Sequence, residues 1–143
     1  MNRLFGISHV CLGVTALARS RRFYLEGLGF QPLAEEAGRG ELDAAGIRLR
    51  LEAGATSPGH SHLRLETLHL DEAVPSLCAL GATLLAEPTS EPERGERSAR
   101  LADPDGHRLE LWRRLRESEL PTPPPLPISR DWEPEAERLA GSL

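Results

Sequence analysis

The feature that most constrains the fold is an internal repeat. Residues 8–12 and 61–65 both begin with Ser-His, and the two halves later reach leucine-glycine pairs at 28–29 and 80–81. Four positions of the first half have a similar residue 53 positions later. They are Ser8, His9, Leu17 and Tyr24, which correspond to Ser61, His62, Leu70 and Leu77. Self-similarity at a fixed period indicates a repeated structural unit. The sequence therefore predicts two copies of one module.

Alternating side chains predict strands in both halves. Polar and apolar residues alternate along 9–14 and 62–66, and again along 46–52 and 108–112. A period of two is typical of a strand with one apolar face. Each half is therefore expected to begin and to end with a strand.

Helical spacing of apolar residues predicts one helix in each half. The helices are expected over 17–28 and 70–80, with Pro75 tolerated in a first turn. The Asp-Pro-Asp-Gly run at 103–106 has the residues of a type I turn and predicts a hairpin. We therefore expect an α+β fold in which the helices cover the apolar face of the sheet and the polar face stays open.

Composition separates a folded body from a tail. Six of the 12 prolines follow residue 120, which predicts an extended, polyproline-like segment. We expect a domain over 1–116, with modules at about 4–56 and 60–115, and a Pro-rich C-terminal tail over 117–143. Trp132 in this tail could dock on the body or on a partner subunit.

Charge and hydropathy exclude several classes of partner. The net charge is −5, all basic residues are arginines, and no basic run is present, so a nucleic acid partner is not expected. Apolar stretches are far shorter than the roughly 20 residues that span a bilayer. The N-terminal sequence does not indicate a secretory signal, and the two cysteines are expected as reduced thiols, so we expect a cytoplasmic protein.

Three residues on the predicted polar face suggest a metal site. His9 and His62 occupy equivalent positions in the repeat, and Glu110 lies on the last predicted strand. A pseudo-twofold axis between the halves would bring the two imidazoles together. Two neutral imidazoles and one carboxylate can hold a divalent metal and leave positions open for substrate.

Other polar residues are candidate substrate contacts. Arg48 and Arg50 could bind a carboxylate or phosphate, or be neutralised by Glu52 and Glu66. Cys11 could contact substrate or simply fill space on its strand. His69 and His107 are expected at the surface.

The paired modules, the histidines that open them and the closing run 103–111 resemble the vicinal oxygen chelate superfamily. This superfamily includes glyoxalase I, extradiol dioxygenases, fosfomycin-resistance thiol transferases and bleomycin-binding proteins. The resemblance covers about residues 4–115. It implies two βαβββ modules forming a U-shaped half-barrel with helices on its outer face. It also implies a divalent ion (Fe, Mn or Zn) bound by His9, His62 and Glu110.

The chain departs from some members of this superfamily. Glyoxalase I has a fourth ligand, a carboxylate, at a position that corresponds here to Arg50. Extradiol dioxygenases use two histidines and one glutamate, and His60 is the candidate for their additional histidine. Fosfomycin enzymes share the three ligands, and some have a cysteine at the position of Cys11.

The resemblance implies an enzyme acting on a small substrate with vicinal oxygens. Its three ligands favour dioxygenase-type chemistry, with a fosfomycin-type thiol transferase or a glyoxalase-type lyase as alternatives. A non-catalytic drug- or metabolite-binding protein is an alternative of another class. The cationic Arg50 beside an incompletely neutralised metal predicts an anionic substrate. A homodimer is also expected.

Overall fold

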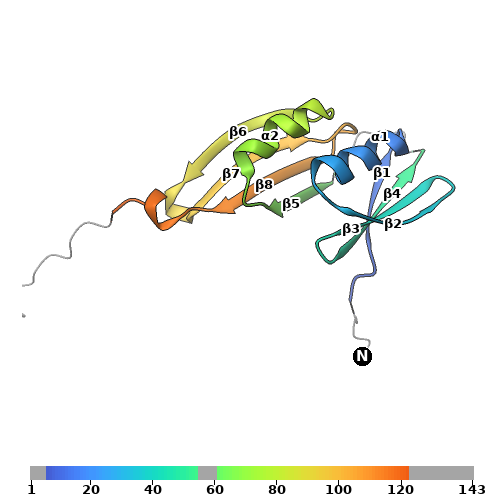
Figure 1. Ribbon diagram of the computed structural model, residues 1–143, viewed down its shortest axis with the longest axis horizontal. Helices are drawn as coiled ribbons and strands as arrows, with labels where there is room; N and C mark the ends of the chain where they lie inside the picture. Colours follow the sequence, from blue (N-terminus) through green and yellow to red (C-terminus); the bar gives the residue numbers. More distant parts are fainter. Residues whose placement is uncertain (1–5, 55–60, 123–143) are drawn as a thin grey trace, which may run out of the picture.

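The computed structural model describes residues 6–54 and 61–122. Both halves have the same order of elements, strand, helix and three strands (Figure 1). The N-terminal module contains β1 (Val10–Val14), α1 (Leu17–Arg22), the π-helical turn η1 (Phe23–Gly27), β2 (Gln31–Glu36), β3 (Arg39–Ala44) and β4 (Ile47–Ala53). The C-terminal module contains β5 (His62–Glu66), α2 (Leu70–Ala79), β6 (Thr83–Glu91), η2 (Pro92–Arg94), β7 (Glu96–Ala102), β8 (Arg108–Arg114) and η3 (Glu117–Glu119).

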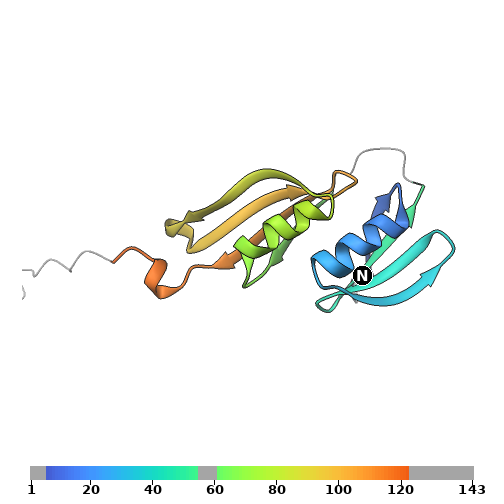
Figure 2. The same ribbon diagram turned by 45° about the horizontal axis from the view of Figure 1, so that its top comes forward.

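Strand pairing confirms the repeat. The sheets have the orders β1-β4-β3-β2 and β5-β8-β7-β6, and in each the first strand runs parallel to the last while the other pairs are antiparallel. The two sheets follow one another along the long axis, each with its helix on one face (Figure 2). The predicted α+β fold of two βαβββ modules is confirmed, and it is open rather than a closed barrel.

The apolar faces of the strands meet the helices in one continuous core. Alternation along the strands buries leucines on the helix side and leaves polar residues on the opposite face. The core contains residues of both modules, among them Leu12, Leu51, Leu77 and Leu109. The modules are therefore joined by apolar packing, and the opposite faces of their sheets are free to form a site.

Two details of the helices differ from the sequence prediction. Pro75 is the sixth residue of α2, so its expected place in the first turn is wrong. It is exposed, and it lacks the N–H that would donate to the carbonyl of Asp71. The predicted helix over 17–28 changes to a π-helical turn at Phe23, which buries the Phe23 and Tyr24 side chains.

The turn between β7 and β8 docks on the N-terminal module. Asp105 accepts hydrogen bonds from the backbone N–H of Thr15 (2.9 Å), from the Thr15 hydroxyl (2.7 Å) and from the Ser20 hydroxyl (2.8 Å). The Tyr24 hydroxyl donates to Asp103 at 2.6 Å. The predicted hairpin is confirmed, and it also fastens the two modules together.

His107 is part of this junction. Its expected surface position is wrong, because the residue is only 4% exposed. Its Nε2 lies 2.7 Å from the carbonyl oxygen of Gly13 and therefore donates to it, since a carbonyl can only accept. His69, in contrast, is exposed as expected.

The predicted domain ends at residue 116, directly before η3. Glu119 in η3 accepts two hydrogen bonds of 2.8 Å from Arg113 in β8, so the start of the predicted tail is attached to the sheet. Residues 123–143 of the tail, Trp132 included, lie outside the described residues. Among the helices that the structure describes, none has the length and apolar character needed to cross a membrane.

Candidate functional site

The strongest candidate site lies on the polar face of the second sheet. His62 in β5 and Glu110 in β8 lie on neighbouring parallel strands, with His62 opposite Arg108 and Arg64 opposite Glu110. The Nε2 atom of His62 lies 3.6 Å from Oε2 of Glu110. The structure therefore brings together two of the three residues predicted as metal ligands.

Arg64 positions the carboxylate of this pair. Its Nε lies 3.3 Å from Oε1 of Glu110, on the side away from His62, and its other end pairs with Glu96. Its guanidinium also stacks over Trp112, 4.4 Å from the ring centre. Burial disfavours the charge of Arg64, but Glu96 and Glu110 outweigh burial and raise the pKa of Arg64. One Glu110 oxygen is thus held by a permanent cation, and the other faces His62.

This arrangement suits a metal-ligating glutamate. Outer partners that hold the second oxygen of a ligand fix its orientation. Arg64 was not among the residues that the sequence predicted to act in the site. Alternation along 62–66 and 108–112 was the available signal, because it places Arg64 and Glu110 on the polar faces of their strands. The parallel pairing that sets the two residues opposite each other comes from the structure.

His9 lies in the other module, directly before β1. Its Nδ1 lies 3.0 Å from the hydroxyl of Ser8, and the residue is half-buried. In the part of the chain that the structure describes, no group of three histidine, cysteine or acidic side chains is close enough to hold a metal ion. A single described chain therefore supplies His62 and Glu110 but does not add His9 to them.

Arg50 and Arg48 are paired with an acidic residue of the neighbouring strand. Arg50 donates to Oε1 of Glu41 at 2.8 Å, and Nε of Arg48 lies 3.7 Å from Oε2 of the same carboxylate. The hydrogen bond from Arg50 lowers the pKa of Glu41, so the carboxylate stays ionised. The glutamate that pairs with both arginines is therefore Glu41, which the sequence did not indicate. Of the two glutamates expected from the sequence, Glu52 lies 4.0 Å from Arg50, whereas Glu66 pairs with Arg114.

Cys11 and His60 complete the predicted set. Cys11 is exposed on β1, opposite Arg50. Burial, followed by the charge of Glu52, raises the pKa of the Cys11 thiol, so it is not activated as a nucleophile. His60 lies outside the described residues.

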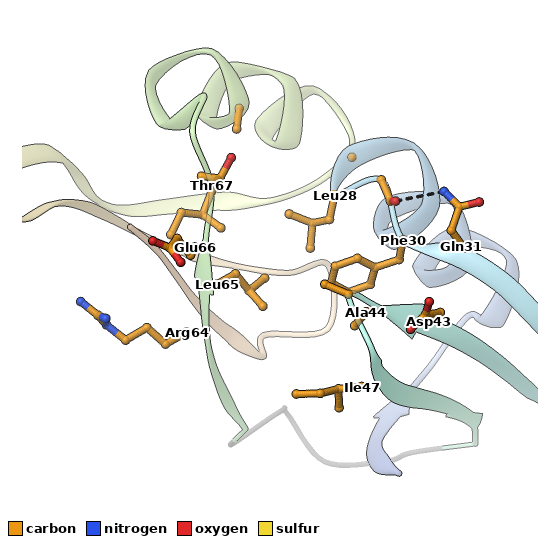
Figure 3. Close-up of a pocket in the computed structure, with 15 residues that line it drawn as sticks. Leu28, Phe30, Gln31, Asp43, Ala44, Ile47, Arg64, Leu65, Glu66 and Thr67 are labelled. Atoms are coloured by element: carbon orange, nitrogen blue, oxygen red, sulfur yellow. Dashed lines mark hydrogen bonds between the residues drawn. The ribbon is translucent and has the colours of Figure 1, made fainter. Parts of the chain in front are cut away.

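A cavity of about 590 Å³ lies between the modules (Figure 3). Leu28, Phe30 and Ile47 from the N-terminal module face Leu65 of β5 across it. Neither His62 nor Glu110 lines this cavity. Arg64, which pairs with Glu110, does line it, so the cavity adjoins the polar face that carries the candidate ligands.

Comparison with known proteins gives one family match. A family model described as a glyoxalase-like domain matches residues 9–112. This range includes His9, His62 and Glu110.

Several solved structures are similar in fold. A glyoxalase-related enzyme from Fulvimarina pelagi has 25% identity and a TM-score of 0.68, covering 77% of this chain and 88% of its own. A glyoxalase/bleomycin resistance protein/dioxygenase family enzyme from Burkholderia phytofirmans PsJN has 22% identity and a TM-score of 0.68, covering 76% and 98%. The fosfomycin resistance protein FosX from Listeria monocytogenes has 20% identity and a TM-score of 0.66, covering 82% and 100%.

Proposed function

Because the chain belongs to the glyoxalase-like domain family, we propose that it is a metal-dependent enzyme acting on a small substrate with vicinal oxygens. The observation that carries this proposal is the His62–Glu110 pair, whose nearest atoms are 3.6 Å apart. Arg64 holds the far oxygen of the carboxylate and leaves the near one available. Histidine nitrogen and carboxylate oxygen suit iron, manganese and zinc.

The third ligand in this proposal is His9 of a second copy of the chain. His9 and the His62–Glu110 pair lie in different modules, and β1 and β5 are outer strands of their sheets. A second copy packed against these outer strands would place its His9 beside His62. A homodimer would then contain two equivalent sites.

Exposed apolar residues beside His9 support this assembly. Ile7 is 84% exposed, Ile47 is 60% exposed and Leu33 is 51% exposed. All three line one surface hollow next to His9, together with Val10. Covering such residues is a general driving force for association.

The bound metal would polarise two neighbouring oxygens of the substrate as a Lewis acid. Arg50 occupies the position of the fourth protein ligand of glyoxalase I, and a cation cannot ligate a metal. Its hydrogen bond to Glu41 holds the Arg50 side chain in place. Three ligands leave more positions open than four, which favours dioxygenase-type chemistry. A fosfomycin-type transferase is the second candidate, because the three donors and the fold similarity to FosX are compatible with both. The retained donor residues favour an enzyme over a binding protein without turnover.

Metal binding tests the proposal directly. The metal-free full chain, titrated with Mn²⁺ or anaerobically with Fe²⁺, should bind about one ion per chain. His62→Ala should abolish this binding, because two ligands are too few, and Glu110→Gln should weaken it strongly. His69→Ala is the matched control, since this exposed histidine lies outside the site. Unchanged stoichiometry in His62→Ala would contradict the proposal.

A further inference from the structure

We propose that Arg100 and Arg108 form an oxyanion-binding pair beside His62 and Glu110. The pair would select substrates that carry a carboxylate or phosphoryl group in addition to their vicinal oxygens. This selective role rests on the proposed function, whereas binding of an anion by the two arginines does not require a metal.

Strand register places both arginines next to the candidate ligands. Arg108 lies opposite His62 on β5, and Arg100 lies opposite Glu110 on β7. Arg108 and Glu110 are two residues apart on β8, so all four side chains project from the same face. Arg100 and Arg108 are diagonal neighbours across β7 and β8, with Cα atoms roughly 7–8 Å apart, which is within reach of long side chains. One anion can therefore contact both guanidinium groups.

Neither arginine has an acidic partner in the described residues. Both are exposed, and no carboxylate of residues 6–54 and 61–122 lies within 4 Å of either guanidinium. The nearest acid in register, Glu110, is already engaged by Arg64 and His62. Two cations thus face the site without compensation.

The internal repeat makes this imbalance specific to the second module. In the first module, Glu41 on β3 lies opposite Arg50, and it pairs with both Arg50 and Arg48. The equivalent strand position in the second module, opposite Glu110, holds Arg100. An arginine therefore stands where the repeat has a neutralising glutamate.

Arg108 in the second module corresponds to Arg48 in the first. Arg108 and Arg48 each precede the site residue of their strand, Glu110 or Arg50, by two positions. Arg48 has Glu41 at 3.7 Å, whereas Arg108 has Arg100 as its diagonal neighbour. An oxyanion bound between Arg100 and Arg108 would supply the charge that Glu41 supplies in the first module. Guanidinium groups are well suited to this, because they donate pairs of hydrogen bonds to carboxylate and phosphate oxygens.

Arg48 and Arg50 were the expected anion contacts, but both pair with Glu41, and Glu52 also lies 4.0 Å from Arg50. Arg100 and Arg108 lie beside the only two candidate metal ligands that the described chain brings together. An anion bound there would be next to the proposed metal.

The first test uses inorganic phosphate as the probe and the metal-free full chain. Saturable binding, measured by calorimetry or by phosphorus NMR, is expected for the wild type. The Arg100→Gln/Arg108→Gln double variant should bind about tenfold more weakly or not at all. Arg114→Gln is the matched control, because Arg114 lies on the same strand but pairs with Glu66. No saturable binding to the wild type, or equal binding to the double variant, would overturn the inference.

The second test uses two probes that differ only in one anionic group. Catechol and 3,4-dihydroxybenzoate present the same vicinal oxygens to the metal-loaded chain. The wild type should bind 3,4-dihydroxybenzoate about tenfold more tightly than catechol, and the double variant should lose this preference. Equal weakening of both probes in the double variant would contradict the selective role.

Metal titration of the same proteins separates the two proposals. If the wild type binds phosphate through Arg100 and Arg108 but binds no metal, the proposed function fails and the anion site stands. If the metal binds and phosphate affinity is unchanged in the double variant, the anion site fails and the proposed function stands.

Discussion

At the scale of single residues, Tyr24 is a polar side chain whose ionisation is strongly disfavoured by its position in the core. It is fully buried, and its hydroxyl donates to Asp103 at 2.6 Å. Burial, followed by the charge of Asp103, raises the pKa of Tyr24 far above its usual value. The native state therefore keeps this phenol protonated under conditions in which an unfolded chain would ionise it.

This difference predicts a loss of stability at alkaline pH. An unfolded tyrosine ionises near pH 10.0, so the stability that Tyr24 contributes is fully present below that pH and is lost as the pH rises above it. The free energy of unfolding should fall by about 1.4 kcal/mol per pH unit there. Tyr24 is the only tyrosine and the chain has no lysine, so few other side chains titrate in this range.

Tyr24→Phe should remove this alkaline dependence. At neutral pH the substitution should cost about 1–2 kcal/mol, because Asp103 loses one hydrogen bond. Urea unfolding at several pH values between about 8 and 11 measures both effects. Identical alkaline slopes in the two proteins would show that Tyr24 does not control this range.

The candidate site shows what residue patterns could and could not predict. Alternation correctly assigned His62 and Glu110 to one sheet face, because side-chain direction follows from strand period. It could not show that His9 would lie apart from them, since that depends on how the modules pack. It also left open whether Arg50 would be free or paired, because the partner, Glu41, comes from the neighbouring strand.

At the scale of elements, the turn between β7 and β8 both closes a hairpin and binds the N-terminal module, and its sequence indicates only the hairpin. Local turn residues predicted the hairpin, and the structure confirms it. Its contacts to Thr15 and Ser20 join residues 90 and 85 positions apart, and no local pattern reports contacts at that distance. The same reason explains why His107 was wrongly expected at the surface.

Asp105 should therefore stabilise the junction between the modules. Its side chain is only 4% exposed, and it accepts three hydrogen bonds from Thr15 and Ser20. Asp105→Ala should lower the free energy of unfolding by about 2–4 kcal/mol, because Thr15 and the buried Ser20 lose a charged acceptor. Asp71→Asn is the control, since the exposed pair that Asp71 forms with Arg97 should contribute less than about 1 kcal/mol.

The pH dependence of stability in the wild type and in Asp105→Ala checks the role of Asp105. Burial raises the pKa of Asp105, but hydrogen bonds from Thr15 and Ser20 and the charge of Arg19 outweigh it and leave the pKa lowered. A lowered pKa contributes stability that is present above the unfolded value of 3.8 and is lost as the pH falls below it. Asp105→Ala should remove this part of the acid dependence. Equal stability of Asp105→Ala and wild type would refute the role of the junction.

At the scale of the whole molecule, the open edges of the sheets are the main unexplained feature. β1 and β5 each pair with one strand only in the described chain, and exposed apolar residues lie beside β1. Exposed strand edges and apolar patches favour association. The proposed homodimer accounts for both features, and it also explains why one chain holds His62 and Glu110 without His9.

Mixing two defective variants tests whether the metal site is shared between copies. His9→Ala and His62→Ala should each fail to bind metal as homodimers, because each removes one ligand from every site. In a mixed dimer, His9 of one copy can join His62 and Glu110 of the other, so one of the two sites is intact. Random exchange of subunits should therefore restore about a quarter of the wild-type metal content. Metal analysis after unfolding and refolding the variants together, with each variant refolded alone as control, measures this recovery. If all three ligands came from one chain, the mixture would stay as empty as its components, and the shared site would be wrong even though metal binding by the wild type remained.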